Sequence, residues 1–459
     1  MRQVALCGFL LFISHLPGCQ PAGRYQALES PEKKKEIPFS PSQVWMKPKP
    51  AAFDLPILFI PDSNPEWAQL PAFWNHFPRP PAGLPTCHLG QTPLEALSAM
   101  VLAAQGEAVK IKVPRGLPDP TSNIPGSNPP TLAAWQLGKS LFFDKILVIS
   151  EFEIYSCSKC HDPKHGFCED YAFKYGRKNA PSLLNCVYNK HQFWDGRVKT
   201  LEQVVFRNSE KVTGERQAQE HNWTDLVSRL RKSEVYQKRF KQVYGIPPTQ
   251  DIIVKALATY MRTILSGNSV YDRTLAARGK DNELIAKHFE AALKNDDLNA
   301  LGQGKKAETA VRLGKGSSLF FGKARCSQCH FAPLFTDQDF HNIGLEFTDF
   351  DIPLGRLAQV PVGRKEGRLQ GAYKTPTLRN LPRTEPYMHN GKFKTLEEVV
   401  DYFDRGINPQ DSLAAQLMQS PGEPQRLSLT KEEIGDLVLF LRALDGAEID
   451  PVLRAPNKK

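Results

Sequence analysis

The chain has 459 residues, of which 41% are hydrophobic and 10% aromatic. These values are typical of a globular protein and exclude a disordered or a mainly membrane-spanning one, and the length suits two or three domains. The formal net charge is +10, but lysines and arginines are spread along the chain and no nucleic-acid-binding motif accompanies them. The charge therefore predicts a solvated basic surface that attracts small acidic partners, and no nucleic acid as a partner.

The N-terminus begins with one charged residue, Arg2, followed by the apolar run VALCGFLLFIS. A run of this length is too short to span a bilayer and is typical of a secretory signal peptide. We therefore expect residues 1–18 to be a signal peptide and the protein to be exported, to the periplasm in a bacterium. The sequence LPGC that ends at Cys19 is similar to the lipobox of bacterial lipoproteins, although Pro17 fits it poorly, so Cys19 is a candidate for lipid attachment to a membrane.

Residues 19–130 are predicted to form a proline-rich extension, in which the fourteen prolines of 21–90 disfavour continuous helix or sheet, whereas TPLE at 92–95 predicts the start of a helix that ends near Gly106. Beyond this extension, strand signals are few and short. Apolar residues recur at helical spacing in 249–265, and 430–446 combines such a stripe with a capping box formed by Thr430 and Glu433. The predicted fold class is therefore mainly α.

Two similar stretches indicate a duplicated module. LGKSLFFDK precedes CSKCH at 157–161, and LGKGSSLFFGK precedes CSQCH at 326–330. Repetition at this distance predicts two domain-sized copies of one unit. We place them at 131–305 and 306–448, with 449–459 as a tail.

Both short segments have the form CxxCH. In such a segment two thiols bind one haem covalently through its vinyl groups, and the next residue is the proximal histidine of the iron. Zinc is disfavoured because structural zinc pairs usually lie roughly fifteen to twenty residues apart, and a redox dithiol gives no reason for a histidine after both pairs. The predicted attachment residues are Cys157, Cys160 and His161 for the first haem and Cys326, Cys329 and His330 for the second.

Three cysteines remain outside the signal region and the two CxxCH segments, namely Cys87, Cys168 and Cys186. An odd number allows at most one disulfide within the chain. Cys168 and Cys186 are the pair nearest in sequence, with Cys87 left over, but the sequence leaves the pairing open.

The surrounding segments resemble, in order, the bacterial dihaem cytochrome c peroxidase family, which includes MauG. The resemblance runs from about residue 110 to 446 and rests on CSKCHDPKHGF, NAPSLLN, FWDGRVKTLEQ, FHNIGL, KTPTLRN and PYMHNGKFKTLEEVV. It implies two cytochrome c-like domains, a first haem that meets hydrogen peroxide and a second that collects electrons from a small cytochrome c or cupredoxin. Reduction of peroxide to water is the implied activity. MauG-like oxidation of a partner protein and non-enzymatic electron carriage are the alternatives, and a homodimer is the oligomeric state under consideration.

The same resemblance implies roles for individual residues. Trp194, in FWDGR, corresponds to the family's tryptophan between the haems and is a candidate electron relay, with packing in the core as the alternative. Glu210 is the best match to the glutamate that moves a proton during peroxide cleavage, and Glu215 competes with it. Asn179 corresponds to a residue linked to a calcium ion between the domains.

Two departures from the family pattern concern the sixth ligands of the irons. Family members that need reductive activation carry a distal histidine before NAP, where this chain has only His165, four residues from the proximal His161. We therefore expect the first haem to be open before any reduction. At the second haem the family's ligand position falls on Phe403, which cannot bind iron, and the sequence leaves open whether Tyr402, Met388 or neither is the ligand.

Overall fold

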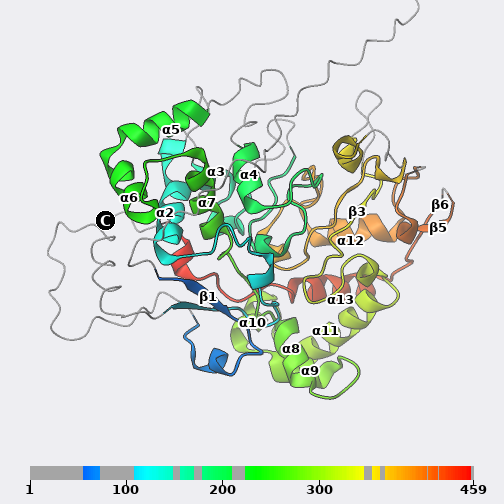
Figure 1. Cartoon of the computed structure of the whole chain (residues 1–459). Helices are drawn as coiled ribbons and strands as arrows, with labels where there is room; N and C mark the ends of the chain where they lie inside the picture. The colour runs from blue at the N-terminus through cyan, green and yellow to red at the C-terminus, as the bar shows by residue number, and fades with distance from the viewer. Residues whose placement is uncertain are drawn as a thin grey trace, which may run out of the picture. The chain divides into compact units, whose positions relative to one another are not determined.

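The structure is a computed structural model that describes residues 55–72, 108–147, 156–169, 178–208, 223–345, 354–361, 367–410, 412–421 and 423–455. Helices predominate in these ranges and the strands are short (Figure 1), as the predicted fold class requires. The predicted signal peptide and Cys19, Cys87, Glu210 and Glu215 lie outside the described residues. None of the described helices combines the length and the apolar character needed to cross a bilayer.

The first group of helices comprises α2 (Leu132–Phe143), α4 (Leu201–Asn208) and α7 (Gln250–Met261), and α7 packs on both others. The apolar stripe expected in 249–265 lies on α7, which is buried along nearly its whole length. α2 crosses α7 at Gly138, where a Cβ atom would lie 1.9 Å from the Ala256 carbonyl oxygen. A glycine is therefore required at this crossing.

The second group comprises α11 (Lys306–Phe321), α12 (Leu396–Asp404) and α13 (Lys431–Arg442), and α13 packs on both others. α13 begins with the predicted capping box of Thr430 and Glu433. α11 crosses α13 at Gly316 in the way that α2 crosses α7. Each half of the chain thus contains the same three-helix arrangement, and each first helix precedes one CxxCH segment.

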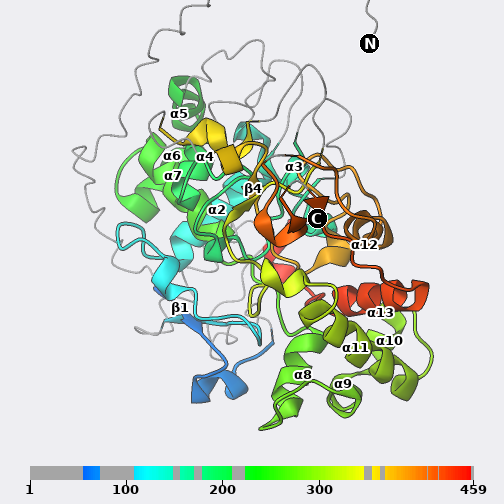
Figure 2. The same cartoon turned by 90° about the vertical axis from the view of Figure 1, so that its right-hand side faces the viewer.

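Two hydrophobic cores correspond to these groups. The first extends to Leu265 and the second begins at Val270, well before the predicted domain boundary after residue 305, because α9 (Ala286–Ala292) packs on α11 and α8 (Val270–Arg278) packs on α9. The predicted tail returns to the first core, in which Ile449 and Leu453 are buried, and the Tyr260 hydroxyl donates to the Leu453 carbonyl at 2.6 Å. In the part of the chain that the structure describes, the other helices of more than one turn are α5 (Trp223–Lys232), α6 (Glu234–Tyr244), α8 (Val270–Arg278), α9 (Ala286–Ala292) and α10 (Asn295–Ala300), and Figure 2 shows α8 and α9 beside α11.

The strands form two-stranded ladders. β3 (Phe340–His341) pairs antiparallel with β4 (Tyr373–Lys374), and β5 (Met418–Ser420) with β6 (Glu423–Pro424). β1 (Ile57–Ile60) pairs in parallel with β2 (Val109–Lys112), with Ile57 opposite Val109. β1 lies in residues 21–90, which were expected to lack continuous sheet, and the apolar residues of both strands join the first core. The expectation was too strict because four residues between prolines are enough for a short strand. The helix predicted from residue 92 lies outside the described residues.

Candidate haem sites and the contact between them

The first CxxCH segment presents a histidine prepared for a metal ion. Cys157–Cys160 form the single turn α3, and His161 caps it. His161 Nδ1 lies 3.0 Å from the Phe167 carbonyl oxygen, which can only accept, so the ring proton is on Nδ1 and Nε2 keeps its lone pair. Burial lowers the pKa of His161, which also favours the neutral ring. A ligand histidine usually donates its other ring N–H in this way.

The second segment repeats this geometry. Cys326–Gln328 form a 3-10 turn, and His330 Nδ1 lies 2.9 Å from the Phe335 carbonyl oxygen. Burial again lowers the pKa of the histidine. Phe167 and Phe335 are both fully buried and both left-handed, with φ of 55° and 53°, a conformation uncommon for residues other than glycine. The same device therefore orients the histidine in both halves.

A following segment holds each acceptor carbonyl in place. In NAPSLLN, the Leu183 N–H donates to the Phe167 oxygen at 3.2 Å and the Ser182 hydroxyl donates to the Gly166 oxygen. The corresponding bonds in KTPTLRN run from the Leu378 N–H to the Phe335 oxygen at 3.3 Å and from the Thr377 hydroxyl to the Leu334 oxygen at 2.6 Å. Both resembling motifs thus support the loop that follows a CxxCH segment.

The residues fit covalent haem better than zinc. Burial raises the pKa of Cys157 and of Cys326 to about 12, as in apolar surroundings. Within the described residues, the group of side chains close enough to share a metal ion is Cys329, Asp337 and His341, which contains a single motif cysteine and does not bring the cysteines of the two segments together. His341 Nε2 lies 2.6 Å from Asp337 Oδ2; although burial opposes it, this contact helps to raise the pKa of His341 to about 10.

The two other described cysteines do not form the disulfide considered from the sequence. The Cys168 thiol donates to the His165 carbonyl at 2.9 Å, and the Cys186 thiol donates to the Met261 carbonyl at 3.6 Å. Both are buried and neither is in a disulfide, so nearness in sequence was a poor guide to pairing. The His165 ring is more than half exposed and lies 3.5 Å from an Asp162 carboxylate oxygen, which is not the setting of an iron ligand.

Trp194 lies where the two halves meet. Its Nε1 donates to the Asn179 carbonyl at 2.7 Å, and its ring lies edge-on to the His389 ring with centroids 6.3 Å apart. The His389 ring stacks on Tyr373 with centroids 3.8 Å apart. Burial, assisted by the charge of Lys178, lowers the pKa of His389 to about 3, so this ring is neutral at physiological pH. A row of neutral aromatic side chains therefore connects the halves.

Two backbone hydrogen bonds make the same junction. The Asn179 N–H donates to the His389 carbonyl, and the Lys374 N–H donates to the Trp194 carbonyl, both at 2.7 Å. Trp194 in FWDGRVKT and His389 in MHNGKFKT occupy equivalent places in the two halves. Asn179 in NAPSLLN and Lys374 in KTPTLRN are equivalent in the same way. The junction is thus made by corresponding residues on both sides.

Asn179 carries an oxygen that is free to bind a cation. Its Nδ2 donates to the Pro386 carbonyl at 2.6 Å, whereas its Oδ1 is buried without a hydrogen-bond partner. An amide oxygen is a common calcium ligand. The calcium ion that the resemblance implies is compatible with this atom.

Comparison with known proteins agrees with this geometry. A family model described as di-haem cytochrome c peroxidase matches residues 133–281. Methylamine utilization protein MauG of Methylophilus methylotrophus is 32% identical over 349 residues, which cover 74% of this chain and 89% of that protein. The chain belongs to the di-haem cytochrome c peroxidase family. Cytochrome-c peroxidase IdrP1 of Pseudomonas sp. (strain SCT) is 31% identical over 364 residues, covering 72% of this chain and 86% of that protein.

A solved structure supports the same assignment. The crystal structure of a MauG-like protein associated with microbial copper homeostasis has 25% sequence identity and a TM-score of 0.54, and the match covers 76% of this chain and 95% of that one. This member of the di-haem peroxidase family is accordingly a cytochrome c peroxidase-type oxidoreductase, and membership implies two haems.

The candidates for the sixth ligand of the second haem lie in different settings. Tyr402 of this di-haem peroxidase is buried, and its hydroxyl already donates a hydrogen bond to the Ile343 carbonyl at 2.8 Å. Phe403 packs edge-on against Tyr402. Met388 is partly buried against the second core in a left-handed conformation, with φ of 73°. The choice between Tyr402 and Met388 stays open.

Sequence reasoning did not identify the carbonyl acceptors or the role of His389. An acceptor carbonyl has no signature in residue identity, because any residue can supply it. The signal for His389 was present, however, since alignment of the two halves places it opposite Trp194.

Proposed function

We propose that this protein reduces hydrogen peroxide to water with electrons from a small cytochrome c or cupredoxin. The observation that supports the proposal most strongly is the paired orientation of His161 and His330, each with Nδ1 on a backbone carbonyl, in halves joined through Trp194. Two equivalent ligand sites linked by aromatic side chains suit a division between an electron-receiving and a peroxide-binding haem.

The cysteines would hold the haems through thioether bonds, and His161 and His330 would be the proximal ligands. Once bound, the haems supply the iron chemistry of peroxide cleavage and one-electron transfer. The chain contributes orientation, because each histidine is fixed by its hydrogen bond. Trp194 is the proposed electron relay, and the neutral His389 ring leaves no charge in its immediate aromatic contact.

Access of peroxide to the first haem is part of the proposal. His165 is exposed and lies beside Asp162, which supports the view that it is not a ligand on the peroxide side of that haem. We propose that this side is open in the fully oxidised protein. Glu210, which follows α4, is the proposed group that moves the proton between the peroxide oxygens.

A calcium ion bound by Asn179 Oδ1 would give this buried oxygen at the junction the partner that it lacks among hydrogen-bond donors. The cytochrome c-like character of the two domains belongs to the same proposal, as do export by residues 1–18, lipid attachment at Cys19 and a homodimeric state.

MauG-like oxidation of a partner protein is the second candidate. It is favoured by 32% identity to a MauG protein and by the similarity to a MauG-like structure. Tyrosine ligation would favour the high-valent iron that such chemistry needs, whereas the Tyr402 hydroxyl is engaged with a backbone carbonyl. This engagement favours peroxide reduction.

The test uses full-length protein produced with c-type haem maturation. A pyridine haemochrome assay should find two haems per chain, and the variant Cys326→Ala/Cys329→Ala should retain one. Addition of peroxide to the two-haem protein with a reduced small cytochrome should give rapid donor oxidation. One haem or none in the wild type would refute the haem assignment, and two haems without donor oxidation by any small cytochrome or cupredoxin would refute peroxide reduction and favour the second candidate.

A further inference from the structure

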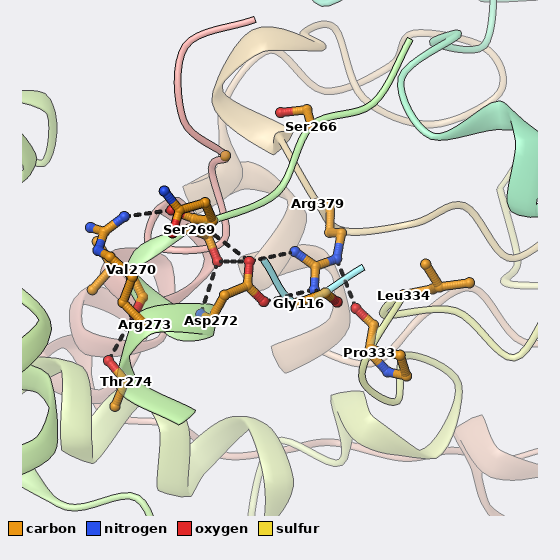
Figure 3. Close-up of polar contacts among 12 residues, drawn as sticks. Gly116, Ser266, Ser269, Val270, Asp272, Arg273, Thr274, Pro333, Leu334 and Arg379 are labelled. Carbon is orange, nitrogen blue, oxygen red and sulfur yellow. Dashed lines mark hydrogen bonds and ion pairs between the residues drawn. The ribbon is translucent and has the colours of Figure 1, made fainter. Parts of the chain in front are cut away.

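Arg379 is a buried arginine that binds the loop after the second CxxCH segment (Figure 3). Its Nε donates to the Pro333 carbonyl at 2.7 Å. Its two terminal nitrogens make a bidentate pair with both carboxylate oxygens of Asp272 at 2.8 Å, and Nη2 also donates to the Gly116 carbonyl at 2.9 Å. The guanidinium therefore joins three segments that are distant in sequence.

The partner carboxylate is fixed from the other side. Asp272 lies in the first turn of α8 and accepts from the backbone N–H and the hydroxyl of Ser269, at 2.9 and 2.8 Å. The side chains of Asp272 and Arg379 are 0% and 1% exposed. A charge pair buried to this extent is tolerated when its remaining hydrogen-bonding capacity is used, and four of the five guanidinium N–H donors are bound here. The pair is a rigid anchor with no net charge.

The anchor completes a set of three consecutive contacts. The carbonyls of Pro333, Leu334 and Phe335 are bound by three consecutive residues of KTPTLRN. The donors are Arg379 Nε for the first, the Thr377 hydroxyl for the second and the Leu378 N–H for the third. The third carbonyl is the one that accepts from His330 Nδ1. We call these three contacts the clamp.

The first half lacks the charged member of the clamp. Leu184 stands in the place of Arg379 and is equally buried, with 3% of each residue exposed. The carbonyl that corresponds to Pro333 belongs to His165 and accepts from Cys168 of its own loop, from N–H at 3.1 Å and from the thiol at 2.9 Å. The two histidines thus donate from Nδ1 to equivalent carbonyls, but different side chains hold the loops that carry these carbonyls.

We propose that Arg379, held by Asp272, is a positioning residue for His330 that sets the second haem apart from the first. The proposal rests on the proposed attachment of a haem at His330. By fixing the clamp, Arg379 keeps the Phe335 carbonyl on His330 Nδ1, and this hydrogen bond raises the basicity of the ligand nitrogen. A more basic ligand stabilises the ferric state, so the clamp lowers the reduction potential of the second haem.

The test removes both charges of the pair together, in the variant Asp272→Asn/Arg379→Gln, so that the net charge around the loop is unchanged. Redox titration of the two-haem protein, followed by optical and electron paramagnetic resonance spectra, measures each haem separately. The second haem should become about tenfold easier to reduce, which is 59 mV for a one-electron couple. Its ferric g values should also change, while the potential of the first haem stays the same.

Thr377→Val provides a second variant for the case that the double variant does not fold. It changes no charge and removes the hydroxyl bond to the Leu334 carbonyl, together with the bond that the hydroxyl accepts from the Arg379 N–H at 3.1 Å, but it leaves the guanidinium contacts in place. A smaller shift in the same direction is therefore expected. The matched control is Arg383→Gln/Asp445→Asn, which removes another arginine–aspartate pair, with Nε and Oδ1 2.7 Å apart, that does not bind the clamp. This control should leave both potentials unchanged.

Each outcome decides the inference. Unchanged potential and g values of the second haem in folded clamp variants that carry two haems would overturn the role of Arg379 and leave the proposed function intact. An equal shift of both haems, or an equal shift in the control, would also overturn it. Wild-type protein with no haem at the second CxxCH segment would overturn both the proposed function and this inference.

Discussion

Gly316→Ala is expected to destabilise the protein although alanine is the better helix former. A Cβ atom at Gly316 would lie 2.1 Å from the Asp436 carbonyl oxygen and 2.8 Å from Phe440 Cβ. Real Cβ atoms essentially never approach non-bonded heavy atoms closer than 3.0 Å. The first of these atoms is backbone, so no side-chain rotation relieves the clash. The helices α11 and α13 would have to move apart by about 1 Å.

The expected magnitude follows from two opposing terms. Overpacking a close contact costs about 1–3 kcal/mol, and a rigid backbone neighbour places this site at the upper end. Replacement of a mid-helix glycine by alanine returns about 1 kcal/mol. The free energy of unfolding should therefore fall by about 2 kcal/mol.

The measurement is guanidinium unfolding of the haem-loaded protein, followed by circular dichroism. Gly435→Ala, on α13, is the matched control, because the nearest atom to its new Cβ is Arg312 Nη2 at an ordinary 3.5 Å. This variant should gain about 0.5–1 kcal/mol. A Gly316→Ala protein as stable as the wild type would refute the close crossing of the two helices.

Three further predictions concern the junction. Trp194→Phe should leave the first reaction of the oxidised protein with peroxide unchanged but slow electron delivery about tenfold, the rate equivalent of about 1.4 kcal/mol, in stopped-flow spectra; equal rates would exclude a relay role. Burial lowers the pKa of Lys374 from 10.5 to about 8, so between these pH values the unfolded chain binds more protons and stability rises with pH. Lys374→Met should thus be up to about 3 kcal/mol more stable than the wild type at pH 7, and this advantage should vanish near pH 10.5; a pH-independent difference would contradict the assignment. Asn179→Ala should lose bound calcium in elemental analysis, and equal calcium in both proteins would exclude this ligand.

The sequence predicted the parts of this protein whose chemistry is local. The CxxCH spacing predicted His161 and His330 as ligands, and the two rings have the same hydrogen bond in the structure. The capping residues of α13 stand where the pattern placed them, because a cap depends on neighbours a few residues away. The support of His330 could not be predicted in this way, since Arg379 reaches Gly116 and Asp272 across more than a hundred residues. Such contacts exist only after the chain has folded.

The reciprocal bonds at the junction have the geometry of a symmetric dimer interface. Asn179 binds His389 while their counterparts Lys374 and Trp194 bind each other, which is the pattern of two subunits related by a two-fold axis. In a dimer of identical chains, any substitution at such an axis changes both sides together. Because both halves here belong to one polypeptide, the two sides vary independently, and a tryptophan can face a histidine across the axis. Covalent fusion thus gives this interface the freedom to make its two haem sites unequal.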